Sequence, residues 1–402
     1  MCFLTGLSAV TFSCPDPAGS GEDSVALAIV KKGYENVLVA ERNDTLYVGF
    51  ENRVWRWETR AVADLVELLA PALREKETLS LTCLHEGIPL LTLILKKDLY
   101  TDLIEHKITA KAFSDSLKSL MPAKTYTEIS RHAAAVNTFY NKVDISIGPL
   151  FKAQFGNWSD PVQVQFSVVP SIRVVFLKGL SLTAQVILPL YNDLEPSGSY
   201  VRPGLLVLSQ TFRLPLNFFV NVSAGYFTRD QYGISAELRK YFFNGKLALG
   251  AVGGYTGTAT MTAGKWAWTP VQDFTWFADA SYRFAVADLT IDAGYGRFIA
   301  GDMGWRCDVS RQFGEVSIGF FAMQSGGIVN GGFNFVVPLP PRRYGTKNYV
   351  RLRPESYVPW EYRAKGLPPE GKSYSTGNGI DELYFNYNPD YIRTNLPDKL
   401  LH

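Results

Sequence analysis

The chain has 402 residues, of which 47% are hydrophobic and 13% aromatic, with 34 Gly and a formal net charge of +2. This charge balance, together with the lack of a basic stripe interleaved with aromatic residues, argues against a nucleic-acid-binding protein. No stretch reaches the roughly 18 uncharged apolar residues of a transmembrane helix, so we expect none.

Residues 1–19 read as a secretion signal that has lost its start. The run from Cys2 to Cys14 is apolar and ends at small residues, but no Lys or Arg precedes it. A lipoprotein cleavage site at Cys14 and an ordinary disordered N-terminus are the alternatives. Cys83 and Cys307 form no CxxC pair, so we predict neither a disulfide framework nor a metal site.

The order of helix and strand patterns in residues 20–104 predicts a small α/β domain. Val62, Leu65 and Leu69 lie at helical spacing in its longer helix. The expected order is helix Val25–Lys32, strands Asn36–Glu41 and Thr45–Phe50, helix Arg60–Arg74, and strands Leu79–Leu84 and Leu90–Lys96. Residues 105–141 follow as a helical linker.

Residues 142–339 form a series of segments in which apolar and polar residues alternate. In the segment Phe218–Tyr226, Val220 and Val222 share one parity with the other apolar residues, while Asn221 shares the other with the polar ones. Such a segment is a strand with one apolar and one polar face. We count about twelve, near 143–155, 162–175, 180–190, 203–213, 217–228, 231–243, 246–256, 272–283, 287–299, 303–311, 314–323 and 329–338.

Strand length and connection length favour an outer-membrane barrel over a soluble sandwich. Many strands approach the ~9–11 residues that a tilted membrane strand needs. Tight connections such as Asn244-Gly245 alternate with longer ones such as Tyr191–Arg202, as at the two ends of bacterial barrels. We therefore predict a mainly β fold, an antiparallel transmembrane β-barrel of about twelve strands in the bacterial outer membrane, with the α/β domain in the periplasm.

The polar face of these strands is expected to line the lumen. Buried unpaired charges cost several kcal/mol, so the long charged side chains should pair across the lumen and leave a narrow or closed resting barrel. The expected braces are Glu237, Arg239, Asp279, Arg283, Arg306 and Asp308. The expected lining residues are Asp144, Gln163, Gln165, Gln185, Asn221, Glu237, Arg239, Asp279, Arg283, Asp292, Arg306, Asp308 and Glu315. Residues 340–402 are rich in Pro and Tyr and are expected to form a periplasmic tail that docks on the α/β domain, or a plug.

Residues that could carry chemistry are few, and we predict a non-enzymatic protein without metal or cofactor. None of the four histidines (His85, His106, His132 and His402) falls in a barrel strand, so a Ser-His hydrolase has no base there. Asp302 lies between Gly301 and Gly304 in an ordinary turn sequence. Paired carboxylates of the glycosidase type stay open among the lumen residues, although their alternation with Arg favours a salt-bridged lumen.

Several runs resemble the YjbH-like exopolysaccharide biosynthesis proteins. They are Gly33–Val37, Asp44–Arg56, Gly294–Phe298, Gly301–Phe313, Gly331–Phe335, Pro338–Pro340 and Tyr362–Gly366. The resemblance implies an outer-membrane β-barrel acting in secretion or assembly of capsule or exopolysaccharide. The partners it implies are outer-membrane lipid, polysaccharide and other export proteins. Longer members have two barrel-forming halves, and this chain is similar to the second; either a separate chain supplies the first half, or this version does without it.

Two other functions stay open from the sequence alone. One is an outer-membrane enzyme that modifies polysaccharide or lipid, which loss of function in Asp302→Asn or Asp308→Asn would favour. The other is a soluble all-β carbohydrate-binding protein, which extraction by carbonate without detergent would favour.

Overall fold

The computed structural model describes residues 21–121, 124–131, 134–155, 162–194, 196–345, 349–364 and 370–401. The signal-like segment 1–19, with Cys2 and Cys14, lies outside the described residues. In the described part, no helix is both long enough and apolar enough to cross a membrane.

The N-terminal domain is a five-stranded sheet in the order β1-β2-β3-β4-β5. β2 and β3 pair in parallel because helix α2 crosses over between them, whereas the other neighbours are antiparallel. Ala61, Val62 and Leu65 of α2 are fully buried. The elements are α1 (Gly21–Lys32), β1 (Glu35–Arg42), β2 (Thr45–Glu51), α2 (Glu58–Leu69), η1 (Ala72–Arg74), β3 (Thr78–His85) and β4 (Ile88–Lys96).

The segment expected to be a linker, residues 105–141, belongs largely to this domain. Phe113 is fully buried and Leu117 nearly so, and both join the domain core. The short strand β5 pairs with β4, so it extends the sheet. Three residues are too few to show a period-2 pattern, which is why the sequence did not indicate this strand. The elements here are α3 (Lys97–Ile104), α4 (Ala110–Ser116), β5 (Lys118–Leu120) and α5 (Lys124–Ile129).

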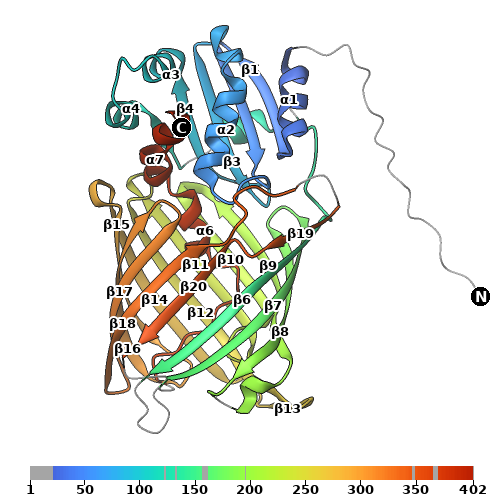
Figure 1. The fold of residues 1–402 in the computed structure, drawn as a ribbon, viewed down its shortest axis with the longest axis vertical. Coiled ribbons are helices and arrows are strands. Elements are labelled where there is room, and N and C mark those ends of the chain that lie inside the picture. Colours follow the sequence, from blue (N-terminus) through green and yellow to red (C-terminus); the bar gives the residue numbers. More distant parts are fainter. Residues whose placement is uncertain are drawn as a thin grey trace, which may run out of the picture.

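The strands between Val143 and Arg363 form a 15-stranded sheet that curls into a barrel shape beneath the N-terminal domain (Figure 1). The expectation of a mainly β fold is therefore confirmed, and each of the twelve expected segments is a strand. They are β6 (Val143–Phe155), β7 (Val162–Leu177), β8 (Leu180–Asn192), β9 (Arg202–Leu214), β10 (Phe218–Tyr226), β11 (Gln231–Phe242), β12 (Leu247–Thr262), β14 (Asp273–Phe284), β15 (Leu289–Arg297), β16 (Met303–Phe313), β17 (Val316–Ser325) and β18 (Ile328–Pro338).

Three further strands were not expected. β13 (Lys265–Trp268) pairs with the far end of β12 in a hairpin that extends beyond the sheet. β19 (Val350–Pro354) and β20 (Tyr357–Arg363) come from the C-terminal region and form the two ends of the strand order.

Most of the tight connections lie at the end of the barrel that faces the N-terminal domain, although the two-residue turn Gly326-Gly327 between β17 and β18 lies at the opposite end. Those that face the domain include η3 (Pro215–Asn217), η4 (Phe243–Gly245) and η5 (Ala285–Ala287), whereas η2 (Pro196–Ser199) belongs to a longer loop at the opposite end. Asn244 adopts a left-handed conformation with φ of 58°, which Asn tolerates better than most residues. Its side chain accepts a hydrogen bond from the backbone N–H of Met121 at 3.3 Å, so this turn also holds the domain.

The two edges of the sheet meet at a seam made by residues 350–363. β19 pairs in parallel with β6, and after Glu355 and Ser356 the same segment continues as β20, which pairs antiparallel with β18. Along β20, no ladder of the described residues reaches β6; aromatic side chains bridge this part. The rings of Phe151 and Trp360 lie 6.3 Å apart. One continuous segment thus holds both edges of the sheet.

The chain ends on the N-terminal domain. Helix α7 (Pro389–Leu401) packs against α2 and α4, and its Ile392 and Leu396 are buried in the domain core. The preceding helix, α6 (Ile380–Tyr387), lies below it at the mouth of the barrel (Figure 1). The C-terminal region therefore contacts both parts of the molecule.

Candidate functional site

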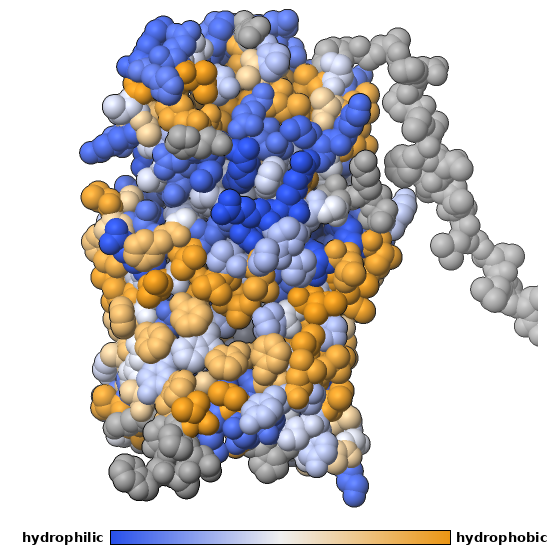
Figure 2. Space-filling view, viewed as in Figure 1, coloured by the Kyte–Doolittle hydropathy of each residue, from blue (hydrophilic) through white to orange (hydrophobic). Residues whose placement is uncertain are grey.

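The inner and outer faces of the barrel differ as the alternating pattern predicts. On β17, Ile318 and Phe320 are 44% and 67% exposed on the outer face, while Ser317 and Ser325 are buried on the inner face. Figure 2 shows hydrophobic side chains spread over the barrel wall below a hydrophilic belt at the junction with the N-terminal domain. The lumen is therefore the polar, enclosed side of the sheet.

One charged cluster on the inner wall connects three strands. Arg239 on β11 makes two hydrogen bonds to Asp279 on β14, at 2.9 and 3.2 Å, across the intervening strand β12. Gly250 lies between them on β12, and a Cβ there would collide with both side chains. Arg239 also donates to Glu237 at 3.1 Å. These charges pair along the wall, not across the lumen as expected, because a glycine leaves room for next-nearest strands to bond.

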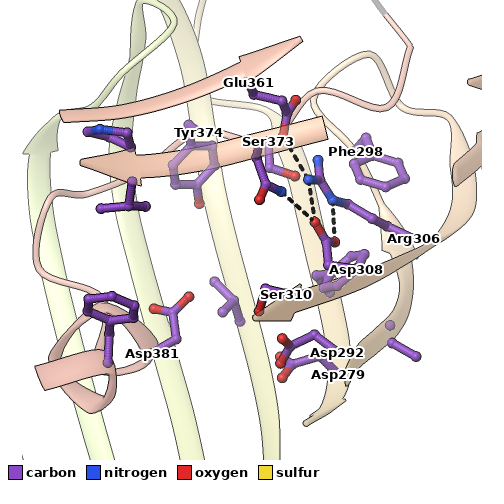
Figure 3. A pocket seen from close by; sticks show the side chains of 18 of the residues that line it. Asp279, Asp292, Phe298, Arg306, Asp308, Ser310, Glu361, Ser373, Tyr374 and Asp381 are labelled. Carbon is purple, nitrogen blue, oxygen red and sulfur yellow. Dashed lines mark hydrogen bonds and ion pairs between the residues drawn. The ribbon is translucent and has the colours of Figure 1, made fainter. Parts of the chain in front are cut away.

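A second cluster lies near the seam (Figure 3). Arg306 on β16 binds both oxygens of Asp308 at 2.8 and 2.7 Å, and its guanidinium also reaches Glu361 of β20 at 2.7 Å. Asn334 donates to Asp308 at 3.2 Å. The guanidinium carbon of Arg306 lies 4.3 Å from the ring centre of Phe321, a favourable cation–π distance. Glu361 of the C-terminal region thus contributes a carboxylate to this cluster on the barrel wall.

Asp292 and Arg283 are inner-wall residues in different surroundings. Asp292 lies directly opposite Asp308 on the neighbouring strand, and both residues line a cavity inside the barrel. Arg283 lies near the mouth, where it binds Asp288 at 2.6 Å and sits over the ring of Tyr391 of α7. Neither residue takes part in bracing across the lumen.

Asp144 lies at the junction between barrel and domain, not deep in the lumen. Arg351 of β19 binds it at 2.5 and 2.9 Å and also reaches Glu35 of the domain at 3.0 Å. Arg53 approaches Asp144 at 3.4 Å and binds Glu51 at 2.9 Å. These guanidinium groups compensate the negative charge of the buried Asp144 side chain.

A second ionic contact crosses the same junction. Arg173 of β7 binds Glu86 of the domain at 2.5 Å. Burial of Glu86 would raise its pKa, yet Arg173 and other cations lower the pKa to about 2. Glu86 is therefore ionised at any physiological pH, and the junction is held by buried, paired charges.

Glu315 differs most from its expected place. It lies in the tight turn between β16 and β17, at the mouth of the barrel, and binds Arg56 of the N-terminal domain at 2.5 and 2.9 Å. The turn begins one residue before Glu315, so alternation along β16 does not set its direction. Glu315 is a docking residue rather than part of the lumen lining.

The uncharged candidates lie on the inner wall of the other half of the sheet. Asn221 donates to Thr211 at 2.8 Å, and Gln165 donates to the Gly198 carbonyl at 3.2 Å. Gln163 donates to the Asp193 carbonyl at 3.1 Å, and Gln185 faces Ser171 in register. Their hydrogen bonds are local and hold strands and the far loop in place.

The lumen also contains the C-terminal segment 370–388, which is part of the region 340–402 expected to form a tail or a plug. It starts at the far end, where Gly371 donates to Asp302 at 2.8 Å, and it ends at the mouth with α6. Between these points the Asn378 amide donates to Ser209 at 3.0 Å and the Ile380 N–H donates to Glu237 at 2.8 Å. Residues from opposite walls thus hold the segment inside the barrel.

Tyr374 fixes the lower part of this segment. Its ring stacks on Phe227 with centroids 5.1 Å apart and an angle of 10°. A Cβ at Gly254 of β12 would overlap the Tyr374 hydroxyl, so the absence of a side chain at Gly254 makes the notch that receives it. We name residues 370–388 the lumen segment.

Between the lumen segment and the wall lies a cavity of about 710 Å³. Figure 3 shows Asp279, Asp292, Arg306, Asp308, Glu361 and Asp381 around it. Within the described ranges no group of three or more His, Cys, Asp or Glu residues is arranged to hold a metal ion. His85 is half-buried in the N-terminal domain, and desolvation lowers its pKa to about 4. His132 and His402 lie outside the described residues.

Comparisons with known proteins identify a family. No curated protein matches the chain. Among solved structures, OccK2 (OpdF) of Pseudomonas aeruginosa is similar, with 13% identity, 48% of this chain and 59% of that chain covered, and a TM-score of 0.29. Such a score is no evidence for a particular barrel. The family model described as exopolysaccharide biosynthesis protein YbjH matches residues 13–333. The match confirms the resemblance found in the sequence, and the chain belongs to this YjbH family.

Proposed function

We propose that this protein is a non-enzymatic β-barrel of the bacterial outer membrane that serves the secretion or assembly of exopolysaccharide or capsule. The outer face of the sheet is the observation that carries the proposal. Apolar side chains that a water-soluble protein would bury are exposed there, among them Leu206, Phe212, Ile234 and Phe320. An apolar patch of this extent marks contact with lipid or a partner.

The N-terminal domain gives the proposal an orientation. It covers the end of the barrel that carries most of the tight turns, which in bacterial barrels is the periplasmic end. The domain and α7 would then face other export components, and a separate chain would supply a first barrel half. The lumen segment closes the resting barrel, so polymer would pass only after that segment moves, or through a pore built with a partner.

The first test concerns location. The protein should stay in the membrane pellet after a carbonate wash, should require detergent for extraction, and should change its gel mobility on heating. Release by carbonate alone would contradict insertion and favour a soluble carbohydrate-binding protein.

The second test concerns the pathway. A clean deletion should leave polymer synthesised but reduced or mislocalised at the cell surface, and complementation should restore it. Asp302→Asn, which keeps an oxygen for the Gly371 N–H, should complement as well as the wild type, because no reaction depends on this carboxylate. Normal surface polysaccharide in the deletion strain would sink the proposed role.

A further inference from the structure

The cavity beside the lumen segment is large enough for a ligand. Its volume of about 710 Å³ falls within the roughly 300–1,000 Å³ that ligand pockets span. The lining comes from the inner wall between β11 and β20 and from Tyr374, Asp381 and Phe385 of the lumen segment. The wall of the sheet and the lumen segment therefore enclose one cavity between them.

Carboxylates outnumber cations in the cavity interior. Its lining has five carboxylates and three guanidinium groups, those of Arg239, Arg297 and Arg306. Arg239 and Arg306 are already engaged by their partners on the wall, as described above. Asp292 and Asp381 make no ion pair with any residue in the described part of the chain. Asp292 also lies directly opposite Asp308, an arrangement that destabilises a sheet when both groups are charged. The compartment therefore carries an excess of carboxylates over guanidinium groups.

Apolar ring surface lies in the same compartment. Phe277 and Phe298 pack with ring centroids 5.7 Å apart at the cavity wall. The Tyr374 hydroxyl is buried and has no hydrogen-bond partner among the described residues, so it offers one donor. Aromatic faces beside carboxylates combine apolar contact with hydrogen-bond acceptance.

We propose that this cavity binds a short segment of uncharged glycan, a proposal that rests on the proposed role in exopolysaccharide export. Each sugar unit has several hydroxyl donors for the carboxylates and an apolar C–H face for the phenyl rings. An anionic glycan would bring negative charge next to Asp292 and Asp381, and the repulsion between like charges would weaken its binding. The site therefore selects against uronic-acid polymers.

Calorimetric titration of the full chain in detergent tests the site. The probes are uncharged tetrasaccharides of β-1,4-glucose, α-1,4-glucose and β-1,4-N-acetylglucosamine, with a tetragalacturonate as the anionic control. We expect saturable binding of at least one uncharged probe, binding at least tenfold weaker for tetragalacturonate, and at least tenfold loss of affinity in Asp292→Ala. Val222→Ala, which changes the exposed outer face, should bind as the wild type does.

Three results would overturn the site: no uncharged probe binds, tetragalacturonate binds equally well, or Asp292→Ala binds with unchanged affinity. Removal of Asp292 relieves a like-charge pair, so the variant should fold, and heat-modifiable gel mobility checks this. The export phenotype of the deletion strain is measured independently of these titrations, so failure of the site leaves the proposed function to its own test.

Discussion

Glu58 is a buried carboxylic acid whose surroundings disfavour its charged form. It lies at the start of α2, 3% exposed, and accepts a hydrogen bond from Asn52 at 3.0 Å. Burial raises its pKa from 4.5 to about 7. The folded protein therefore keeps the proton that the unfolded chain releases, and stability falls as pH rises from about 4.5 to about 7.

This linkage predicts the effect of Glu58→Gln. The interval between 4.5 and about 7 corresponds to roughly 3 kcal/mol, so the variant should raise the free energy of local unfolding by up to that amount at pH 8. The difference should nearly vanish at pH 4.5, where the folded wild type is protonated. Hydrogen exchange of the α2 amides at the two pH values measures it, and equal protection of both proteins at pH 8 would contradict the burial argument.

At the scale of single residues, the sequence predicted which side chains face inward but not which pair. Period-2 alternation places Arg239 and Asp279 on the polar face without further information. Their bond depends on Gly250 between them, and a glycine in a strand pattern does not reveal what approaches it. Glu315 was assigned to the lumen by the same alternation, which no longer applies once the chain has entered a turn.

Helix α7 joins the C-terminus to the N-terminal domain. Leu396 is 1% exposed in the domain core, and Arg393 donates to the Ser114 carbonyl of α4 at 2.9 Å. Leu396→Ala should cost about 2–5 kcal/mol, the usual range for a buried leucine, and should release the helix end. Limited proteolysis should then cut within α7 of the variant faster than in the wild type.

Asp398→Ala is the matched control in the same helix, because Asp398 is exposed. It should leave the cleavage rate within twofold of the wild-type rate. If Leu396→Ala is cleaved no faster than Asp398→Ala, α7 is not held by this contact.

At the scale of elements, regular structure was predictable and the C-terminal region was not. The twelve consecutive barrel strands follow from alternation and turn residues, which are local signals. The strands β19 and β20 are only five and seven residues long, which leaves little room for a period-2 pattern to show. Their pairing, like the course of the lumen segment, depends on contacts with strands far away in the sequence.

At the scale of the molecule, one C-terminal region performs three structural tasks. Residues 350–363 hold both edges of the sheet, the lumen segment fills the interior, and α7 fastens the chain to the N-terminal domain. Buried ion pairs such as Arg351 with Asp144 join the same parts. In the proposed membrane orientation, the periplasmic domain is thus connected directly to the lumen segment.

In the proposed function the lumen segment closes the resting barrel, and a substitution at Gly254 would disturb this closure directly. A side chain there would displace Tyr374 from its notch, whereas a Cβ at Gly253 on the opposite face of the same strand meets nothing within 4 Å. Gly254→Leu should therefore loosen the segment, and Gly253→Leu should not. Both variants must first show the heat-modifiable gel mobility of the wild type.

Planar-bilayer recording of the wild type and of these two variants is the most direct measurement. Wild type and Gly253→Leu should show no large steady conductance, and Gly254→Leu should show long-lived open events. A large steady conductance of the wild type, or equal silence of both leucine variants, would contradict closure by the lumen segment.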